Sequence, residues 1–267
     1  MNVFLREVRA YRTSTLIWAA SLSTLVIVFL VGMYPAFSQD VEASKQLISQ
    51  LPEAIQRAFS IQVSTFFTVY GFFAYLLNFA VVAGAVQAMN LGTGVISKEI
   101  SGKTADFLLS KPITRPKVIS SKLVAALLAI VFTSTVFAVV SLVCANIATT
   151  EPVSTRNFLL MASTFFLIQL FFLVLGALFA VIIPKIKSVI AVTLPTVFAF
   201  FIVGTLGDLI GNVDVRYITP FKFFDPMYMA GSGRIEGRFL ALEVVLVVIA
   251  LVATYLIFLK KDVRAAA

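Results

Sequence analysis

Histidine is absent from this 267-residue sequence, and cysteine occurs only once, as Cys144. Histidine is the commonest general base and the commonest metal ligand, so its absence argues against most metalloprotease and histidine-dependent hydrolase mechanisms. A single cysteine forms no intramolecular disulfide and no cysteine metal cluster. Because Cys144 lies in an apolar run, we expect it to serve in packing. We therefore predict no catalytic, metal-binding or cofactor-binding residues in this chain.

Charged residues are also scarce, at 13% of the chain, whereas hydrophobic residues make up 60% and the mean hydropathy is +1.01. A water-soluble fold of this size could not bury so much apolar surface. Several apolar runs approach the length of about 20 residues that a helix needs to cross a bilayer. The net charge of +8 would suit a nucleic-acid-binding protein. Membrane proteins carry such an excess in their cytoplasmic loops, however, so we expect no nucleic-acid partner.

Hydropathy predicts an all-α polytopic membrane protein with a single transmembrane domain over 1–267. Six transmembrane helices are expected, with edges uncertain by several residues. They cover about 14–33, 66–95, 123–147, 158–183, 189–206 and 239–259.

Lysine and arginine are distributed unevenly between the two sides of these spans. The N-terminal segment, the loops after the second and fourth spans, and the C-terminal tail together carry about twice as many as the opposite side. Positive residues concentrate in cytoplasmic loops. We therefore expect a multi-pass protein of the cell membrane, in the bacterial case the cytoplasmic membrane, with both termini cytoplasmic.

The segment 1–13 precedes the first span and is amphipathic. Phe4, Val8 and Tyr11 recur at helical spacing on one face, and three arginines occupy the other. This pattern predicts a short helix in the inner membrane interface, with its arginines facing anionic lipid headgroups. The alternative is a disordered basic leader that only sets the topology.

The cytoplasmic segment 96–122 is too long and too patterned for a passive turn. Apolar residues such as Ile96, Ile100 and Phe107 form a stripe beside a charged face, which predicts a helix lying across the base of the membrane domain. Pro112 and Pro116 should end this helix, because proline lacks a backbone donor and disfavours helix in the residue before it.

Gly102, Lys103 and Thr104 match the end of a phosphate-binding P-loop. That motif also needs a glycine five residues before Gly102, where this chain has Ser97, and it follows a buried strand rather than a transmembrane helix. We therefore expect no ATP binding by this chain itself.

The same segment is similar to the signature of the type-2 permease family of ATP-binding-cassette (ABC) transporters. In that family an acidic residue precedes a Gly-x-Thr, a Leu-Leu pair and a Pro-x-x-Arg, and Lys103 inside the Gly-x-Thr is a departure that we expect to be tolerated. The stretch from Pro220 to Asp225 before the last span also resembles bacterial members. The matching positions are Glu99, Gly102, Thr104, Phe107, Leu108, Leu109, Pro112, Ile113, Arg115 and Lys122.

The resemblance implies that 96–122 contains a coupling helix that docks on a cytoplasmic ATP-binding-cassette ATPase subunit. It further implies an exporter built from two permease chains, identical or related, in which the ATPase subunits bind the ATP. Three alternatives stay open. They are a secondary transporter or channel without an ATPase partner, a membrane-embedded enzyme, and a helix that only seals the membrane interface.

Several polar residues lie at membrane depth, among them Asn78, Gln87 and Gln169. Polar side chains at this depth line a substrate path or join helices by hydrogen bonds. Sequence alone leaves both roles open, with helix packing favoured. Glu243 lies about one turn inside the outer end of the last span, where we expect an interfacial position. Ala80, Gly84 and Ala88 repeat at a spacing of four, which predicts close approach of another helix.

Overall fold

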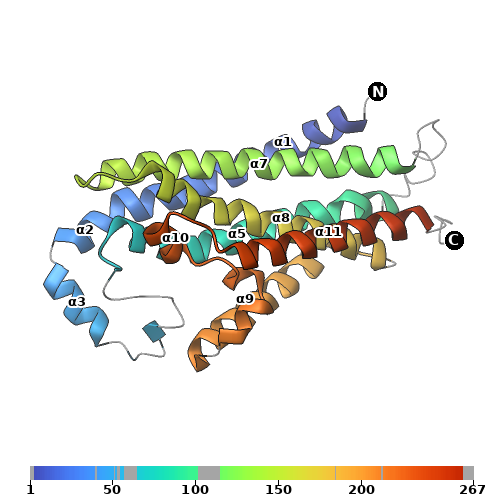
Figure 1. Ribbon diagram of the computed structural model, residues 1–267. Coiled ribbons are helices and arrows are strands. Elements are labelled where there is room, and N and C mark those ends of the chain that lie inside the picture. Colours follow the sequence, from blue (N-terminus) through green and yellow to red (C-terminus); the bar gives the residue numbers. More distant parts are fainter. Residues whose placement is uncertain are drawn as a thin grey trace.

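The computed structural model describes residues 3–39, 41–50, 52, 55–56, 65–101, 115–183, 185–211 and 213–260. Within these ranges the regular structure is entirely helical (Figure 1). The helices are α1 (Val3–Val26), the π-helical η1 (Ile27–Met33), α2 (Tyr34–Gln39), α3 (Val41–Ser49), α5 (Val69–Ser101), α7 (Arg115–Ala148), α8 (Thr155–Ile182), α9 (Val189–Ile210), the 3-10 turns η2 (Val213–Tyr217) and η3 (Pro220–Lys222), α10 (Pro226–Ser232) and α11 (Gly237–Lys260).

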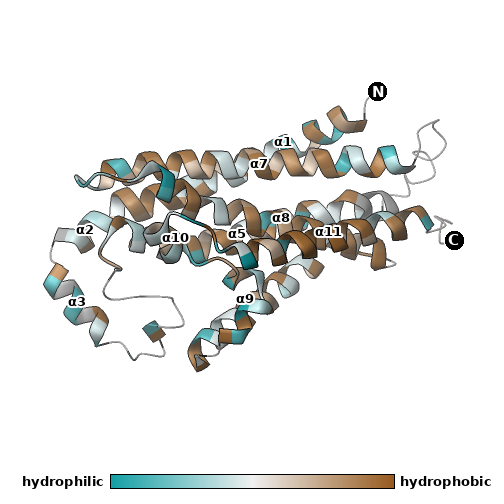
Figure 2. Ribbon diagram, in the orientation of Figure 1, coloured by the Kyte–Doolittle hydropathy of each residue, from teal (hydrophilic) through white to brown (hydrophobic). Residues whose placement is uncertain are grey.

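Six described helical stretches are long and apolar enough to cross a membrane, which confirms the predicted all-α polytopic fold. Hydrophobic residues dominate the long helices (Figure 2). The stretches are Val3–Ser38, Val69–Val95, Pro116–Ala148, Thr155–Ile182, Val189–Ile210 and Gly237–Lys260.

The bundle has two ends that differ in what they carry (Figure 1). At the terminal end, the first turns of α1 lie near the start of α7 and the end of α11. At the distal end lie the short helices α2, α3 and α10. We use these two names from here on, because the ion pairs described below divide between the two ends.

The first helix corrects one predicted boundary. The sequence suggested a separate helix over 1–13 before a span at 14–33, whereas α1 runs without a break from Val3 and continues through η1 into α2. Its buried face includes Glu7, Tyr11 and Thr15, and this helix packs chiefly against α7. The three arginines of the pattern are exposed. Location of the first turns at a membrane surface stays a prediction.

Two helices extend beyond the spans that hydropathy predicts. Helix α5 continues past residue 95 to Ser101, and α7 begins at Arg115, well before residue 123. Pro116 is the second residue of α7, where its missing N–H has no helical partner to lose. Pro116 therefore opens this helix. Only 102–114 separates α5 from α7, and that stretch lies outside the described residues.

Helices α5 and α8 form the tightest pairing in the bundle, as the predicted small-residue spacing requires. Ala80 and Ala88 are fully buried, and a Cβ on Gly84 would lie 2.5 Å from the Phe165 ring. On the facing helix, a Cβ on Gly176 would lie 2.6 Å from the carbonyl oxygen of Met89. Small residues at these positions let the two backbones approach closely, which is how membrane helices gain packing contacts.

Candidate functional site

The predicted coupling residues fall around the junction of α5 and α7 at the terminal end. Glu99 is in the last turn of α5, and Arg115 is the first residue of α7. The other predicted coupling residues lie outside the described residues, so their arrangement stays a prediction. These are Gly102, Thr104, Phe107, Leu108, Leu109 and Pro112.

Lys122, two turns into α7, is the centre of a buried polar cluster near this junction. Its Nζ donates a hydrogen bond to the carbonyl oxygen of Val95 at 2.9 Å and lies 3.4 Å from Oε1 of Glu7. Lys122 is 3% exposed and Glu7 is 8% exposed. Burying a charge costs free energy unless it is paired and hydrogen-bonded, and both conditions are met here. One side chain thus joins α1, α5 and α7.

A second contact connects the same part of α7 to the last helix. The hydroxyl groups of Ser120 and Tyr255 lie 2.7 Å apart, with either able to donate the hydrogen bond. Tyr255 belongs to α11, close to its end at Lys260. The first turns of α7 therefore hold direct polar contacts with three other long helices.

Gln87 and Gln169 meet in the middle of the bundle. Gln169 Nε2 donates to Gln87 Oε1 at 3.0 Å, and Gln87 Nε2 donates to the Thr133 hydroxyl at 2.9 Å. Ser134 donates to Gln169 Oε1 at 2.6 Å. Each amide group donates and accepts, and the network joins α5, α7 and α8. Such complete pairing favours helix packing over a substrate path for these two glutamines.

Asn78 lies apart from this network and lines a cavity at the distal end. Its amide donates to the Ala74 carbonyl oxygen within its own helix at 3.3 Å. The cavity has a volume of about 430 Å³, within the range of small-molecule sites. Its wall combines apolar residues such as Leu77 and Ile168 with four charged residues. These are Asp208, Arg216, Lys222 and Asp225.

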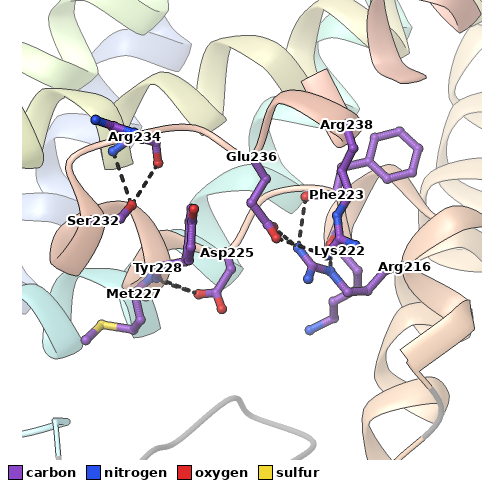
Figure 3. A network of polar contacts seen from close by, with 10 residues as sticks. All are labelled: Arg216, Lys222, Phe223, Asp225, Met227, Tyr228, Ser232, Arg234, Glu236 and Arg238. Carbon is purple, nitrogen blue, oxygen red and sulfur yellow. Dashed lines mark hydrogen bonds and ion pairs between the residues drawn. The ribbon is translucent and has the colours of Figure 1, made fainter. Parts of the chain in front are cut away.

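The charged residues at this cavity are held by a network that sequence reasoning did not identify (Figure 3). Arg216 donates to the carbonyl oxygens of Lys222 at 3.0 Å and Phe223 at 3.2 Å, and it forms an ion pair with Glu236. Its guanidinium also lies 4.2 Å from the centre of the Phe239 ring. No sequence motif predicts these partners of Arg216, because the contacts depend on how 213–238 folds back on itself.

Two further side chains complete the distal wall. Lys222 forms an ion pair with Asp208 of α9. Asp225 caps α10 by accepting hydrogen bonds from the backbone N–H groups of Met227 at 2.9 Å and Tyr228 at 3.2 Å (Figure 3). The four cavity charges are therefore engaged with the protein, and two are positive and two negative.

Glu243 is enclosed by the bundle, with its residue 2% exposed. Its expected position near the membrane interface stays a prediction. Neither carboxylate oxygen has a hydrogen-bond partner among the described residues. The sequence did not reveal this burial, because it depends on the packing of α11 against α8. In the described part of the chain, no group of acidic or cysteine residues could hold a metal ion.

Six long apolar helices, several of them joined by buried polar contacts, define a polytopic membrane protein. The chain belongs to the ABC-2 transporter family, because the model described as ABC-2 family transporter protein matches residues 1–263. No curated protein matches the chain. The resemblance seen in 96–122 is thus confirmed at the level of the family. The chain is a membrane-embedded permease component of an ABC transporter.

Proposed function

We propose that this chain is the permease subunit of an ABC exporter, driven by ATP that a separate cytoplasmic ATPase subunit hydrolyses. Two permease chains, identical or related, would form the transport unit with two ATPase subunits. The chain itself contributes no nucleotide site, in keeping with the incomplete P-loop at Gly102, Lys103 and Thr104.

The observation that carries this proposal is the projection of helix ends at the terminal end of the bundle. The apolar part of α5 ends at Val95, but the helix continues for six more residues to Ser101. Six helical residues add about 9 Å. Glu99 is carried by this extension, and α7 begins at Arg115 on the other side of 102–114. Glu99 and Arg115, two residues of the matching motif, thus lie at the ends of long helices.

These long helices matter because coupling is a mechanical step. When ATP closes two ATPase subunits, a docked helix shifts with them, and a helix joined directly to a long span carries that shift into the membrane. The ATPase must bind the two arrangements of the permease with different affinity, since only differential binding moves the equilibrium. The positive charge of the loops at this end supports a cytoplasmic location.

A transporter without an ATPase partner is the second candidate, and Glu243 is the observation that favours it. A carboxylate buried at membrane depth is a common feature of proton and ion pathways. This second candidate predicts transport that depends on a proton gradient and continues without ATP. The ABC-2 family membership favours the ATP-driven proposal.

The decisive experiment is assembly with the ATPase. Leu108→Asp places a charge on the apolar face that we expect to dock, at a cost of several kcal/mol when the charge is left unpaired. The variant should reach the membrane in normal amount but fail to co-purify with the ATP-binding subunit. Ser38→Asp, at the distal end, is the matched control and should assemble normally. Normal assembly of Leu108→Asp would show that the helix is not a docking element.

A further inference from the structure

We propose that Lys122 is a positioning residue that joins α5 and α7, the helices on either side of 102–114, to α1, so that these three helices move as one body. This inference rests on the proposed function for its mechanical meaning. It adds a residue-level account of how movement enters the membrane domain, and it is carried by contacts within the described residues.

The hydrogen bond from Lys122 to Val95 closes the segment at its base. The two residues are 27 positions apart in the sequence and flank 96–121. Residue 95 ends the apolar part of α5, and residue 122 lies two turns into α7. With this bond formed, a lateral push on the segment cannot separate α5 from α7 without breaking a buried charge-assisted contact.

Glu7 extends the fastening to the first helix. Its Oε1 lies 3.4 Å from Nζ of Lys122 and 3.4 Å from a guanidinium nitrogen of Arg6. Glu7 belongs to the buried face of α1 that packs along α7. Because the ion pair sits between packed helices, α1 follows α7 when the base of α7 is displaced. We call Glu7, Lys122 and the Val95 carbonyl the base clasp.

The clasp is distinct from a contact that only adds stability. Replacing both partners of a buried ion pair by apolar residues of similar volume is often neutral in other proteins, whereas removing one partner leaves the other charge buried and lowers stability. Loss of stability alone therefore does not identify a positioning role, and the comparison of Lys122→Met with Lys122→Arg in helix distance does. A positioning contact requires the donor itself. Lys122→Met keeps most of the side-chain volume but removes the cation, whereas Lys122→Arg keeps the cation and the donors.

The first experiment tests the clasp in the permease alone, in lipid nanodiscs. In a Cys144→Ala background, cysteines that carry spin labels replace the exposed Arg9 on α1 and the exposed Lys117 on α7. We expect a narrow distribution of the α1–α7 label distance in the parent protein and in Lys122→Arg. In Lys122→Met we expect a broad distribution without the narrow peak. Glu7→Gln should give an intermediate width, because glutamine still accepts a hydrogen bond from Lys122. Lys187→Met, which removes an exposed lysine elsewhere, is the control and should keep the narrow peak.

A Lys122→Met distribution as narrow as that of the parent protein overturns the proposal. So does a Lys122→Arg distribution as broad as that of Lys122→Met, because a cation would then not be what fastens the helices. If Lys122→Met does not reach the membrane, the same comparison is made with Glu7→Gln. A Glu7→Gln distance distribution as narrow as that of the parent protein then overturns the proposal, and a broader one supports it.

The second experiment tests the mechanical role with the ATPase subunit bound. Lys122→Met should co-purify with the ATPase as the parent does and keep its KM for ATP, while the kcat of the complex returns to that of the free ATPase. Lys122→Arg should restore the kcat of the parent complex. An unchanged kcat in Lys122→Met, or a loss of assembly, would remove the clasp from the coupling step. If the parent protein binds no ATPase, the proposed function fails, and the spin-label result still stands or falls by itself.

Discussion

At the terminal end of the bundle, one buried lysine contacts helices that are far apart in the sequence, whereas at the distal end the charged residues mostly contact their own neighbourhood. Lys122 reaches a carbonyl 27 positions away and a carboxylate on the first helix. Arg216 reaches carbonyl oxygens only six and seven positions away and Glu236 twenty positions away. Long-range contacts bind helices to one another, and short-range contacts shape a local cap.

This difference suggests a division of work. The terminal end is built so that four helices share their displacement through the base clasp and the Ser120–Tyr255 contact. The distal cap, formed by 213–236 between α9 and α11, holds each charged residue of the cavity through contacts with nearby residues. We expect these contacts to preserve the shape of the cavity. Substitutions at the first end should therefore affect the whole bundle, and substitutions at the second should stay confined to the cap.

The largest expected effect concerns which end faces the cytoplasm. In a Cys144→Ala background, cysteine at the exposed Tyr228 of the distal end should react with an impermeant thiol reagent in intact cells. Cysteine at Lys117 should react only after the cells are permeabilised. The reason is the excess of lysine and arginine around the terminal end. Reaction at Lys117 in intact cells would reverse the orientation and with it the cytoplasmic assignment of the coupling segment.

The next largest effect is on stability at the terminal end. Lys122→Met leaves the buried Glu7 with only the more exposed Arg6 as an ion-pair partner, and breaking a buried pair costs about 3–5 kcal/mol. The free energy of unfolding, measured at equilibrium in bicelles, should fall by this order. Lys187→Met is the control, with an expected change within about 0.5 kcal/mol, typical of a surface site. Equal values for the two variants would show that the buried contacts of Lys122 do not stabilise the fold more than an exposed lysine does.

A smaller and local effect is expected at the distal end. Arg216→Lys keeps the charge but loses the planar group that contacts two carbonyl oxygens and Glu236 at once. The free energy of unfolding should fall by about 1.5–3 kcal/mol, the usual range for hydrogen bonds to charged groups. The thiol reactivity of cysteine at position 228 should rise, while the α1–α7 spin-label distance stays unchanged. A broadened α1–α7 distance would mean that the cap is not mechanically separate.

The smallest effect is expected on the surface of α3. Lys45 and Glu42 are three positions apart at a separation of 3.3 Å, and both side chains are well exposed. Such pairs contribute about 0–1 kcal/mol, because water screens the attraction. Lys45→Ala should leave the unfolding free energy unchanged within error. A loss comparable to that of Lys122→Met would show that exposure does not explain the difference between the ends.

The six spans could be predicted from the sequence because a bilayer imposes a length and a polarity that hydropathy measures directly. The span edges at α5 and α7 could not, since hydropathy falls where charged residues begin while the helices continue beyond the apolar core. Separation of 1–13 from the first span was wrong for the same reason. A change from polar to apolar residues marks no break in the backbone of α1.

The polar residues of the spans were recognised from their type, but their partners were not. Gln87 and Gln169 stood out because amides are rare in apolar runs, yet their mutual hydrogen bond depends on the pairing of α5 with α8. The Glu7–Lys122 contact likewise depends on the packing of α1 against α7, which one sequence does not reveal. The burial of Glu243 was not predicted either, because its place near a helix end does not reveal which residues pack over it.

The π-helical η1 has a consequence for the register of the first span. Buried positions recur every four residues from Val26 through Leu30 to Tyr34. In a regular α-helix, a residue four positions on is rotated by about 40°, so this row would drift away from its partner. The wider turn of a π-helix absorbs that rotation and keeps the row aligned. Deleting one residue within Ile27–Met33 would remove this adjustment and turn the distal part of the helix relative to its base.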